Sequence, residues 1–373
     1  MILHICCNLA GSTVFPQLFE ALDELGIDQQ VFVPEKHASN IGKNKPRRVT
    51  TVQKITVKQS DALLFFRKAQ RSVPTILKEM RLEQCRLIHA HTLFTDGSIA
   101  LALSKKAGIP YGITLRYSDT EVLWRLPWLR PLARSVLRDA SFAVFLGSTV
   151  RERVLDRWVT GEEREKLRRK SCVIPNGISP VWLDGRGRSE CSKPVRVGFA
   201  GRLTDRKQPL QSLEAVHLAD AGNTQHFIWK GCGDGPMKER ILSSLKQDDI
   251  LTGPLHGVDA MKAFYEDIDI LLVPSRAETF GMVYLEAMSR GVPVLYTRGQ
   301  GFDGLFPEGS VGFPVSCGNT KEMAAKLAEI SSGDYRAMSL HCVEAASECA
   351  WPVIAERWKE LYGSVLDDAE RQS

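Results

Sequence analysis

Long apolar runs, cysteine motifs and strong charge are all missing from this sequence, and each absence excludes a class of protein. No apolar stretch approaches the roughly 18 residues that a membrane-spanning helix needs. Residues 1–7 lack the basic region of a signal peptide. The nine cysteines have no spacing typical of zinc or redox sites, so we expect free thiols in a reducing compartment. These features predict a cytoplasmic protein, either soluble or peripheral at the inner face of the membrane.

Charge and length set further limits. The formal net charge is only +5 over 373 residues, far below that of a dedicated nucleic-acid binder, so we expect no nucleic-acid partner. This weak positive charge suits anionic substrates or an anionic membrane surface. With 43% hydrophobic and 25% charged residues the chain is globular, and its length suits two domains.

Short β-rich runs alternate with helical patterns along the whole chain, which is typical of parallel sheets wrapped by helices. The expected strands are 3–7, 30–33, 87–90, 111–115, 142–146, 195–200, 226–230, 268–273 and 293–296, and the expected helices include 14–25, 98–107, 209–219, 282–289 and 320–330. The two halves are alike in construction. We therefore predict an α/β protein of two Rossmann-like, doubly wound domains.

The joint between the domains is expected at Ile174-Pro175-Asn176-Gly177-Ile178, where Pro and Asn-Gly interrupt any regular element. This predicts a first domain over 1–174 and a second over 175–351. In parallel sheets, ligands bind beyond the carboxyl ends of the strands. Three unusual loops of the second half each follow an expected strand, so they should lie together at the carboxyl ends of the strands.

The first loop, 201–209, carries Arg202 and Lys207 beside the start of a helix, a suitable environment for a diphosphate. The alternative is a solvated basic loop. The second loop, 231–236, reads Gly-Cys-Gly-Asp-Gly-Pro, and its glycines allow a backbone to approach a ligand closely. A plain strand–helix turn explains it equally well.

The third loop, 274–286, places two carboxylates around a helix start. Backbone N–H groups near Phe280 to Val283 would be free to bind a phosphate. Glu278 precedes the helix and Glu286 lies about one and a half turns inside it, so the two can serve different hydroxyl groups of one ligand. The alternative is that Glu278 caps the helix and Glu286 is a surface charge.

Together these loops resemble those of the retaining family-4 glycosyltransferases of the GT-B fold. The shared features are a Gly-Arg-Leu…Lys loop, a Gly-x-Gly-x-Gly-Pro turn, and the pattern Pro-Ser-x-x-Glu-x-Phe-Gly-x-x-x-x-Glu-Ala-Met from Pro274 to Met288, whose two glutamates are Glu278 and Glu286. The resemblance implies two domains that face each other across a cleft. It also implies that the C-terminal helix, 352–373, crosses back to the first, acceptor-side domain, and that 175–351 binds the donor.

The resemblance also assigns roles to residues. Arg202 and Lys207 would neutralise the donor diphosphate and Glu278 would hold the transferred sugar, so these three and Arg116 are the expected catalytic residues. Glu286 would bind the ribose, and the base would lie against 251–257. The expected substrate-binding residues are Gly11, His91, Arg202, Lys207, Gly231, Leu255, Glu278, Thr279, Phe280, Gly281, Met282, Val283 and Glu286.

The first half carries looser family features. Gly11 lies in a small-residue loop after the first strand, and His91 ends an Ile-His-Ala-His strand like the family's His-x-His. One departure stands out, because Arg116 replaces the family's histidine after the next strand. Arginine stays charged and cannot be a general base, but it can bind a phosphate or an anionic acceptor.

Two further segments have competing interpretations. Residues 122–138 interleave arginines with Trp and Leu, which suits either peripheral contact with an anionic membrane or a core helix with solvated arginines. Asp267-Ile268-Asp269 matches the Asp-x-Asp of metal-dependent glycosyltransferases. We interpret it as a helix-to-strand junction and expect no metal.

The predicted function is retaining transfer of a hexosyl unit from a nucleotide-diphosphate sugar, without a cofactor. The acceptor would be a saccharide, a lipid-linked or a small molecule, in surface polysaccharide or glycoconjugate biosynthesis. Two alternatives remain open. One is a nucleotide-sugar epimerase of the same architecture, and the other is a non-catalytic nucleotide-sugar-binding protein.

Overall fold

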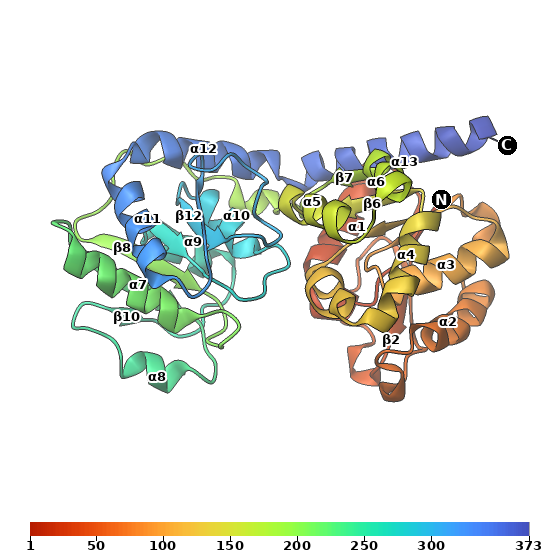
Figure 1. The fold of residues 1–373 in the computed structure, drawn as a ribbon, viewed down its shortest axis with the longest axis horizontal. Helices are drawn as coiled ribbons and strands as arrows, with labels where there is room; N and C mark the ends of the chain where they lie inside the picture. The colour runs from red at the N-terminus through yellow and green to blue at the C-terminus, as the bar shows by residue number, and fades with distance from the viewer. Residues whose placement is uncertain (373) are drawn as a thin grey trace. The chain divides into compact units, whose positions relative to one another are not determined.

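The computed structural model describes residues 1–372, which form two compact α/β units, each a sheet flanked by helices (Figure 1). Unit 1 comprises Met1–Gly177 and the chain from Trp351 onward, and unit 2 comprises Ile178–Ala350. The change of unit thus falls after Gly177 and before Trp351, close to the positions expected at 174 and 352.

Unit 1 contains a seven-stranded parallel sheet in the order β3-β2-β1-β4-β5-β6-β7. This order, in which the chain starts in the middle and winds outward to both edges, is that of a doubly wound fold. The strands are β1 (Ile2–Ile5), β2 (Gln29–Glu35), β3 (Thr50–Ile55), β4 (Leu87–Ala90), β5 (Tyr111–Thr114), β6 (Phe142–Phe145) and β7 (Ser171–Val173).

Helices cover both faces of this sheet and bury two apolar clusters. One cluster unites the sheet with α2, α3, α4, α5 and α6, and the other unites it with α1 and α13. The C-terminal helix therefore packs on unit 1, as the resemblance implied. The helices are α1 (Val14–Glu24), α2 (Phe65–Glu79), α3 (Thr95–Ala107), α4 (Arg130–Asp139), α5 (Ser148–Arg157), α6 (Gly161–Arg169) and α13 (Trp351–Gln372).

Unit 2 contains a six-stranded parallel sheet in the order β10-β9-β8-β11-β12-β13. Its strands are β8 (Val195–Ala200), β9 (Phe227–Cys232), β10 (Ile250–Leu251), β11 (Ile270–Leu272), β12 (Val294–Thr297) and β13 (Gly312–Val315). Its helices are α7 (Pro209–Gly222), α8 (Lys238–Leu242), α9 (Val258–Glu266), α10 (Met282–Met288), α11 (Thr320–Ser332) and α12 (Tyr335–Glu348). The prediction of two doubly wound parallel sheets is confirmed.

The structure also contains strands that the sequence did not indicate. These are β3, β7, β10 and β13, which lie at or next to the edges of the two sheets. Edge strands bury less apolar surface than central ones, so they carry a weaker apolar signal. The strand β3 illustrates this, because its residues are exposed or only half-buried.

Candidate functional site

The three unusual loops of unit 2 meet at one edge of its sheet, as the parallel arrangement predicted. The backbone N–H of Leu203, in the loop after β8, donates to the carbonyl oxygen of Asp234 after β9 at 2.9 Å. The N–H of Arg276, after β11, donates to the carbonyl oxygen of Arg206 at 2.8 Å. These hydrogen bonds fix the three loops to one another.

The glycines of the second loop are explained by this close packing. A Cβ atom on Gly233 would lie 1.9 Å from the carbonyl oxygen of Gly201, so only glycine lets the two loops approach. Gly231, predicted to contact substrate, lies inside β9, and a Cβ there would lie 2.1 Å from the ring of Trp229. The absence of a side chain at Gly231 thus makes room for a core tryptophan.

Lys207 and Glu278 form an ion pair between the first and third loops. Their side chains are 21% and 12% exposed. Glu278 is held further, because its backbone N–H donates to the side chain of Gln300 and its carboxylate accepts the N–H of Thr279 at 3.1 Å. Arg202, the other predicted cation, is exposed to solvent.

The helix α10 begins at the predicted position, and its start is built on a left-handed glycine. Gly281 has φ +87°, and a Cβ there would lie 2.3 Å from the ring of Tyr284. Phe280 is buried and anchors the turn, while Met282 and Val283 are half-buried. N–H groups in the first turn of a helix have no acceptor within the helix, so they are available to a ligand.

Glu286 is not the surface charge that the alternative interpretation required. It is half-buried, and its carboxylate accepts a hydrogen bond from the hydroxyl of Tyr265 at 2.9 Å. Burial raises the pKa of Glu286, while the Tyr265 hydrogen bond lowers it. The sequence offered no signal for Tyr265, which comes from α9.

The segment predicted to hold the base lies directly beside the second loop. The N–H of Thr252 donates to the carbonyl oxygen of Gly231 at 2.9 Å, and the N–H of Gly233 donates to that of Gly253 at 2.8 Å. Leu255 follows on this segment and is half-buried. Gly231 and the segment with Leu255 are therefore neighbours, as a shared ligand would require.

The Asp-x-Asp sequence is a helix-to-strand junction, as we interpreted it. Asp267 follows α9 and pairs with Arg196 at 2.7 Å and with Lys230. Asp269 is buried and accepts the backbone N–H groups of Ser192 and Arg196 at 3.1 and 2.7 Å. Both carboxylates thus hold the amino-terminal edge of the unit 2 sheet together.

In unit 1, Arg116 is held in place after β5 by neutral groups. Its guanidinium donates to the side-chain oxygen of Asn176 at 3.1 Å and to the carbonyl oxygen of His91 at 3.4 Å, and it lies 4.8 Å above the ring of Phe15. Its backbone N–H donates to Asp119 at 2.9 Å. The sequence around Asn176 indicates only a turn and gives no signal for this contact with Arg116. Gly11, after β1, is exposed, with open space where a side chain would project.

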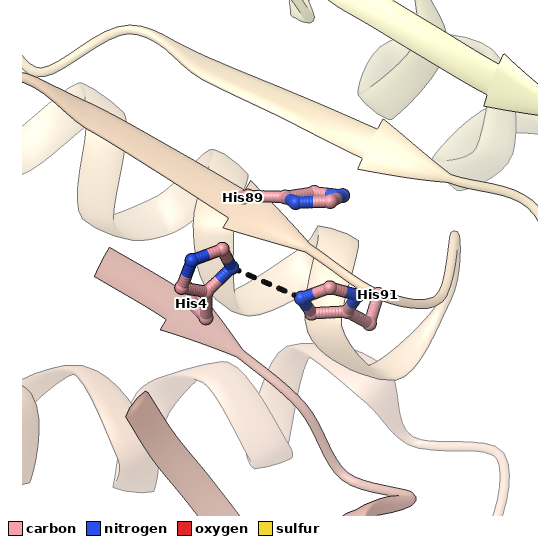
Figure 2. A group of neighbouring side chains, drawn as sticks. All are labelled: His4, His89 and His91. Carbon is pink, nitrogen blue, oxygen red and sulfur yellow. Dashed lines mark hydrogen bonds between the residues drawn. The ribbon is translucent and has the colours of Figure 1, made fainter. Parts of the chain in front are cut away.

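His91 itself belongs to a buried cluster of three imidazoles (Figure 2). His4 and His89 lie at paired positions of β1 and β4, and the His4 Nδ1 and His91 Nε2 atoms are 3.1 Å apart. His89 is hydrogen-bonded to the hydroxyls of Tyr362 and Thr114, each at 2.8 Å. The cluster thereby ties the C-terminal helix α13 to the centre of the sheet.

This environment changes the interpretation of His91. His91 as a whole is only 1% exposed, and the contact that it makes with the Arg116 guanidinium is through its carbonyl oxygen. One ring nitrogen from each of the three histidines lies within 4.8 Å of the other two, close enough for a metal ion. However, both nitrogens of His89 are already bonded to hydroxyls, and no carboxylate belongs to the group that could offset a buried divalent charge. We therefore interpret the cluster as a neutral hydrogen-bonded network.

Most apolar side chains of residues 122–138 pack in or against the core of unit 1, while the arginines of this segment are exposed. Val136 is fully buried, and Trp124 stacks on Trp158 with ring centroids 3.8 Å apart. Trp128, by contrast, is 64% exposed. Among the residues that the structure describes, no helix combines the length and the apolarity needed to cross a membrane.

Comparison with known proteins gives two family matches that together span most of the chain. Residues 187–349 match the model of "Glycosyl transferases group 1", and residues 11–181 match that of "Glycosyltransferase Family 4". The matches coincide with units 2 and 1.

Two relatives illustrate the similarity. The chain is 24% identical over 288 residues to an uncharacterized glycosyltransferase of Methanocaldococcus jannaschii, a match that covers 75% of this chain and 76% of the relative. It is 37% identical over 277 residues to a sulfoquinovosyl transferase of Arabidopsis thaliana, covering 68% of this chain and 51% of that enzyme. The matched region thus spans only about half the length of the plant relative.

A solved structure supports the fold. The apo form of the lipopolysaccharide outer core galactosyltransferase WaaB superimposes with a TM-score of 0.76, covering 98% of this chain and 99% of that one. Its sequence is only 16% identical, so this likeness concerns the fold.

Proposed function

This chain belongs to the family-4 (group 1) glycosyltransferases of the GT-B fold, and from that premise we propose which reaction it catalyses and with which residues. Glycosyltransferases of this group use nucleotide sugars as donors and typically need no cofactor. We propose that this enzyme moves a hexosyl unit from a nucleotide-diphosphate sugar to a saccharide, lipid-linked or small-molecule acceptor. The product would enter a surface polysaccharide or another glycoconjugate.

The observation that carries this proposal is the ion pair of Lys207 and Glu278 beside the start of α10. It brings a cation, a carboxylate and free helix N–H groups to the same edge of unit 2. In our proposal Lys207 and Arg202 neutralise the donor diphosphate, and the N–H groups from Phe280 to Val283 bind its distal phosphate, since that of Thr279 already donates to Glu278. Glu278 then accepts hydrogen bonds from the transferred sugar.

The nucleoside would occupy the other side of this edge. Glu286 would accept hydrogen bonds from the ribose hydroxyls, with Tyr265 orienting its carboxylate. The base would lie against the segment 251–257, next to Gly231 and Leu255. Hydrogen bonds from the backbone of that segment, and not from side chains, would then determine the specificity for the base.

The chemistry we propose is a substitution on one face of the sugar, which retains the anomeric configuration. The bond from the anomeric carbon to the phosphate oxygen breaks, and a bond from the acceptor oxygen to that carbon forms. The acceptor proton passes to the departing phosphate. Lys207, Arg202 and the helix start stabilise the charge that develops on the leaving group, so the step requires no metal.

Arg116 would act on the acceptor side, together with the turn that contains Gly11. Its guanidinium is already oriented by Asn176, Phe15 and the carbonyl oxygen of His91. Because arginine keeps its proton, Arg116 would bind an anionic group instead of taking a proton. In this proposal His91 acts through Arg116 and is a positioning residue.

Labelled donors and thermal shifts test the proposal. The full-length protein is heated with a panel of uridine, guanosine and adenosine diphosphate sugars, and the matching donor should raise the melting temperature. Transfer of the label to an acceptor supports our proposal, whereas an epimerised free nucleotide sugar supports the epimerase. Binding without either product supports a non-catalytic protein. Donor binding unaffected by Lys207→Ala and Arg202→Ala would refute the site, with the exposed Lys321→Ala as control.

We propose a cytoplasmic location on the basis of the thiols. All nine cysteines are free, which suits a reducing compartment. Peripheral contact with an anionic membrane would use the exposed Trp128 with the arginines of 122–138. If a Trp128→Ser variant binds anionic vesicles in sedimentation to the same extent as the unchanged protein, this contact is refuted.

A further inference from the structure

The loop at residues 36–48, between β2 and β3, carries a concentrated positive charge. It contains five lysine or arginine side chains and no acidic one, so its own charge of +5 is as large as the net charge of the whole chain. All five are exposed, and none forms an ion pair within the part of the chain that the structure describes. The five are Lys36, Lys43, Lys45, Arg47 and Arg48.

This basic loop has a defined conformation. The backbone N–H of Gly42 donates to the side chain of Gln53 at 2.6 Å. The side chain of Asn44 donates to the carbonyl oxygen of Ala10 at 3.0 Å, which fixes the loop to the turn after β1. The cations are therefore presented by an ordered loop, which reduces the entropy lost when a ligand binds.

The position of the basic loop is that of a ligand-binding loop. It follows the carboxyl end of β2, and the sheet continues from β2 through β1 and β4 to β5. The turn with Gly11 follows β1 and Arg116 follows β5, so all lie at the same edge of the sheet. Ligands of open parallel sheets bind at this edge.

A buried lysine at this edge reinforces the positive charge. Lys68 is only 7% exposed, and its ammonium donates to the carbonyl oxygen of Ala62 at 3.2 Å and to the hydroxyl of Thr95 at 3.3 Å. Burial lowers the pKa of Lys68, and the charge of Lys36 on the basic loop is near enough to lower it further. The starts of α2 and α3, whose dipoles are positive, flank the same ammonium.

The carboxyl groups at this edge are engaged by the backbone. Asp96 accepts the N–H of Cys7 at 3.0 Å, and burial raises the pKa of Asp96 to about 7. Asp119 accepts the N–H groups of Leu93 and Arg116 at 3.1 and 2.9 Å. Two further carboxylates contact the basic loop, since Glu35 accepts from the side chain of Asn40 at 3.1 Å and Glu20 accepts the backbone N–H of Arg47 at 3.2 Å. None of the four carboxylates forms an ion pair with a cation of the loop in the part of the chain that the structure describes, so the edge retains an excess of positive charge.

We propose that the basic loop binds a phosphate or carboxylate group of the acceptor, and that the acceptor is an anionic saccharide. This inference rests on the proposed transferase function, whose acceptor it specifies. A membrane surface is the less suitable occupant, because membrane-binding segments combine cations with several exposed apolar residues. On the basic loop only Ile41 is a large exposed apolar side chain.

Direct binding of defined probes tests the inference. The probes are glucose 6-phosphate, glucuronate and glucose, together with vesicles of phosphatidylcholine with phosphatidylglycerol, all measured at low salt with the whole chain. The test variant is Lys43→Gln with Lys45→Gln. The matched control is Lys78→Gln with Lys106→Gln, two exposed lysines near the ends of α2 and α3, at the opposite edge of the sheet. Each measurement is repeated in the Lys207→Ala background, which weakens anion binding at the donor site.

We expect the two anionic probes to bind more tightly than glucose in both backgrounds. The test variant should lower the affinity for the two anionic probes about three- to tenfold, since each exposed charge pair contributes a modest amount. The control variant should change this affinity by less than about twofold. Affinity for glucose should not change.

Three outcomes would overturn the inference. The test variant could leave the affinity for both anionic probes unchanged, or lower the affinity for glucose as much as that for the anionic probes. The anions could bind only when Lys207 is present, which would assign them to the donor site. The variant could instead lose affinity only for vesicles of phosphatidylcholine with phosphatidylglycerol, which would identify a membrane surface. Failure of the nucleotide-sugar thermal shifts would refute the donor proposal separately, because these probes contain no nucleotide.

Discussion

Lys207 and Glu278, which lie 71 residues apart in the chain, form an ion pair that joins the loops after β8 and β11. Each side chain is thereby held beside the start of α10. A donor diphosphate that binds there would exchange the carboxylate partner of Lys207 for a phosphate, and would leave Glu278 free to accept sugar hydroxyls. The ion pair thus holds the two side chains in position for their proposed ligand contacts before the donor binds.

The first prediction separates the two members of this pair. Lys207→Gln should remove most of the donor-induced thermal shift and lower kcat/KM at least about tenfold, because the diphosphate loses a charged partner. Glu278→Gln should retain most of the thermal shift but lower kcat, because its contact is with the transferred sugar. Lys321→Gln, exposed on α11, is the control. Equal effects of Lys207→Gln and the control on donor binding would contradict the assignment.

The second prediction concerns the pH dependence of donor binding through Glu286. Burial raises the pKa of Glu286, so its carboxylate forms only as the pH rises through that raised value. Because only the carboxylate is a full acceptor for the ribose, kcat/KM should fall on the acid side at a higher pH than an ordinary glutamate would cause. Glu286→Gln should abolish this acid limb.

Tyr265→Phe provides the matching control for that pH profile. The Tyr265 hydrogen bond lowers the pKa of Glu286, so its loss should move the acid limb to higher pH. A limb that stays in place in both variants would show that another group controls it. The profile is measured as kcat/KM against pH with the donor limiting.

Much of the fold and of the candidate site in unit 2 could be predicted because their signals are local. The strand β8 is a short run rich in apolar residues, and the start of α10 is marked by Phe280-Gly281. Since all strands are parallel, loops that follow them must share an edge, and this rule alone predicts that the loops with Lys207 and Glu278 lie together.

What escaped prediction depends on pairing between distant segments. His4 meets His89 only because β1 pairs with β4 in that register, and the hydroxyl of Tyr362 reaches His89 only because α13 packs on unit 1. Asn176 looked like part of a turn, and nothing near it in sequence indicates its contact with Arg116. The charges of the basic loop can be read from the sequence. Its position at the carboxyl end of β2 cannot, because the next strand, β3, was not predicted.

The third prediction uses the buried histidines of unit 1. Burial lowers the pKa of His4 to about 3, and those of His89 and His91 well below the ordinary value. The unfolded chain therefore takes up protons first as the pH falls through about 6.5, so stability is lost below that pH, by up to about 1.4 kcal/mol per pH unit for each imidazole. Asp96 and Asp119 oppose this with two groups, since burial raises their pKa values to about 7 and about 6, but the three imidazoles outnumber them and the net effect is a loss of stability.

Hydrogen exchange at the amides of β1 and β4 measures this loss in unit 1 alone. Protection should decrease from pH 7 to pH 5 after correction for intrinsic exchange, and His4→Gln should reduce the slope. His256→Gln, at an exposed position of unit 2, should not. A slope unaffected by His4→Gln would show that the cluster does not control the acid stability of the sheet.

The fourth prediction concerns the turn before α10. Gly281→Ala should destabilise unit 2 by about 1–3 kcal/mol, because φ is +87° and the new Cβ would meet the ring of Tyr284. The donor-induced thermal shift should fall with it, since the first-turn N–H groups move. Gly222→Ala is the control, because a Cβ there has no atom within 4 Å. Equal stability of both variants would show that the turn adapts without strain.

The last prediction concerns Arg116, which stands where the family commonly has histidine. Its guanidinium bonds Asn176 and the carbonyl oxygen of His91 and lies over Phe15, an arrangement that needs a planar group with several donors. Arg116→Lys keeps the charge but cannot make all these contacts, so kcat should fall at least about tenfold while the donor-induced thermal shift, a property of unit 2, is retained. Asn176→Ala should raise KM for an anionic acceptor more than for a neutral one, because it loosens the guanidinium without removing its charge. If Arg116→His instead restored full activity with the same acceptor, the guanidinium would have no specific role, and an anionic acceptor group would have to be bound by the basic loop alone.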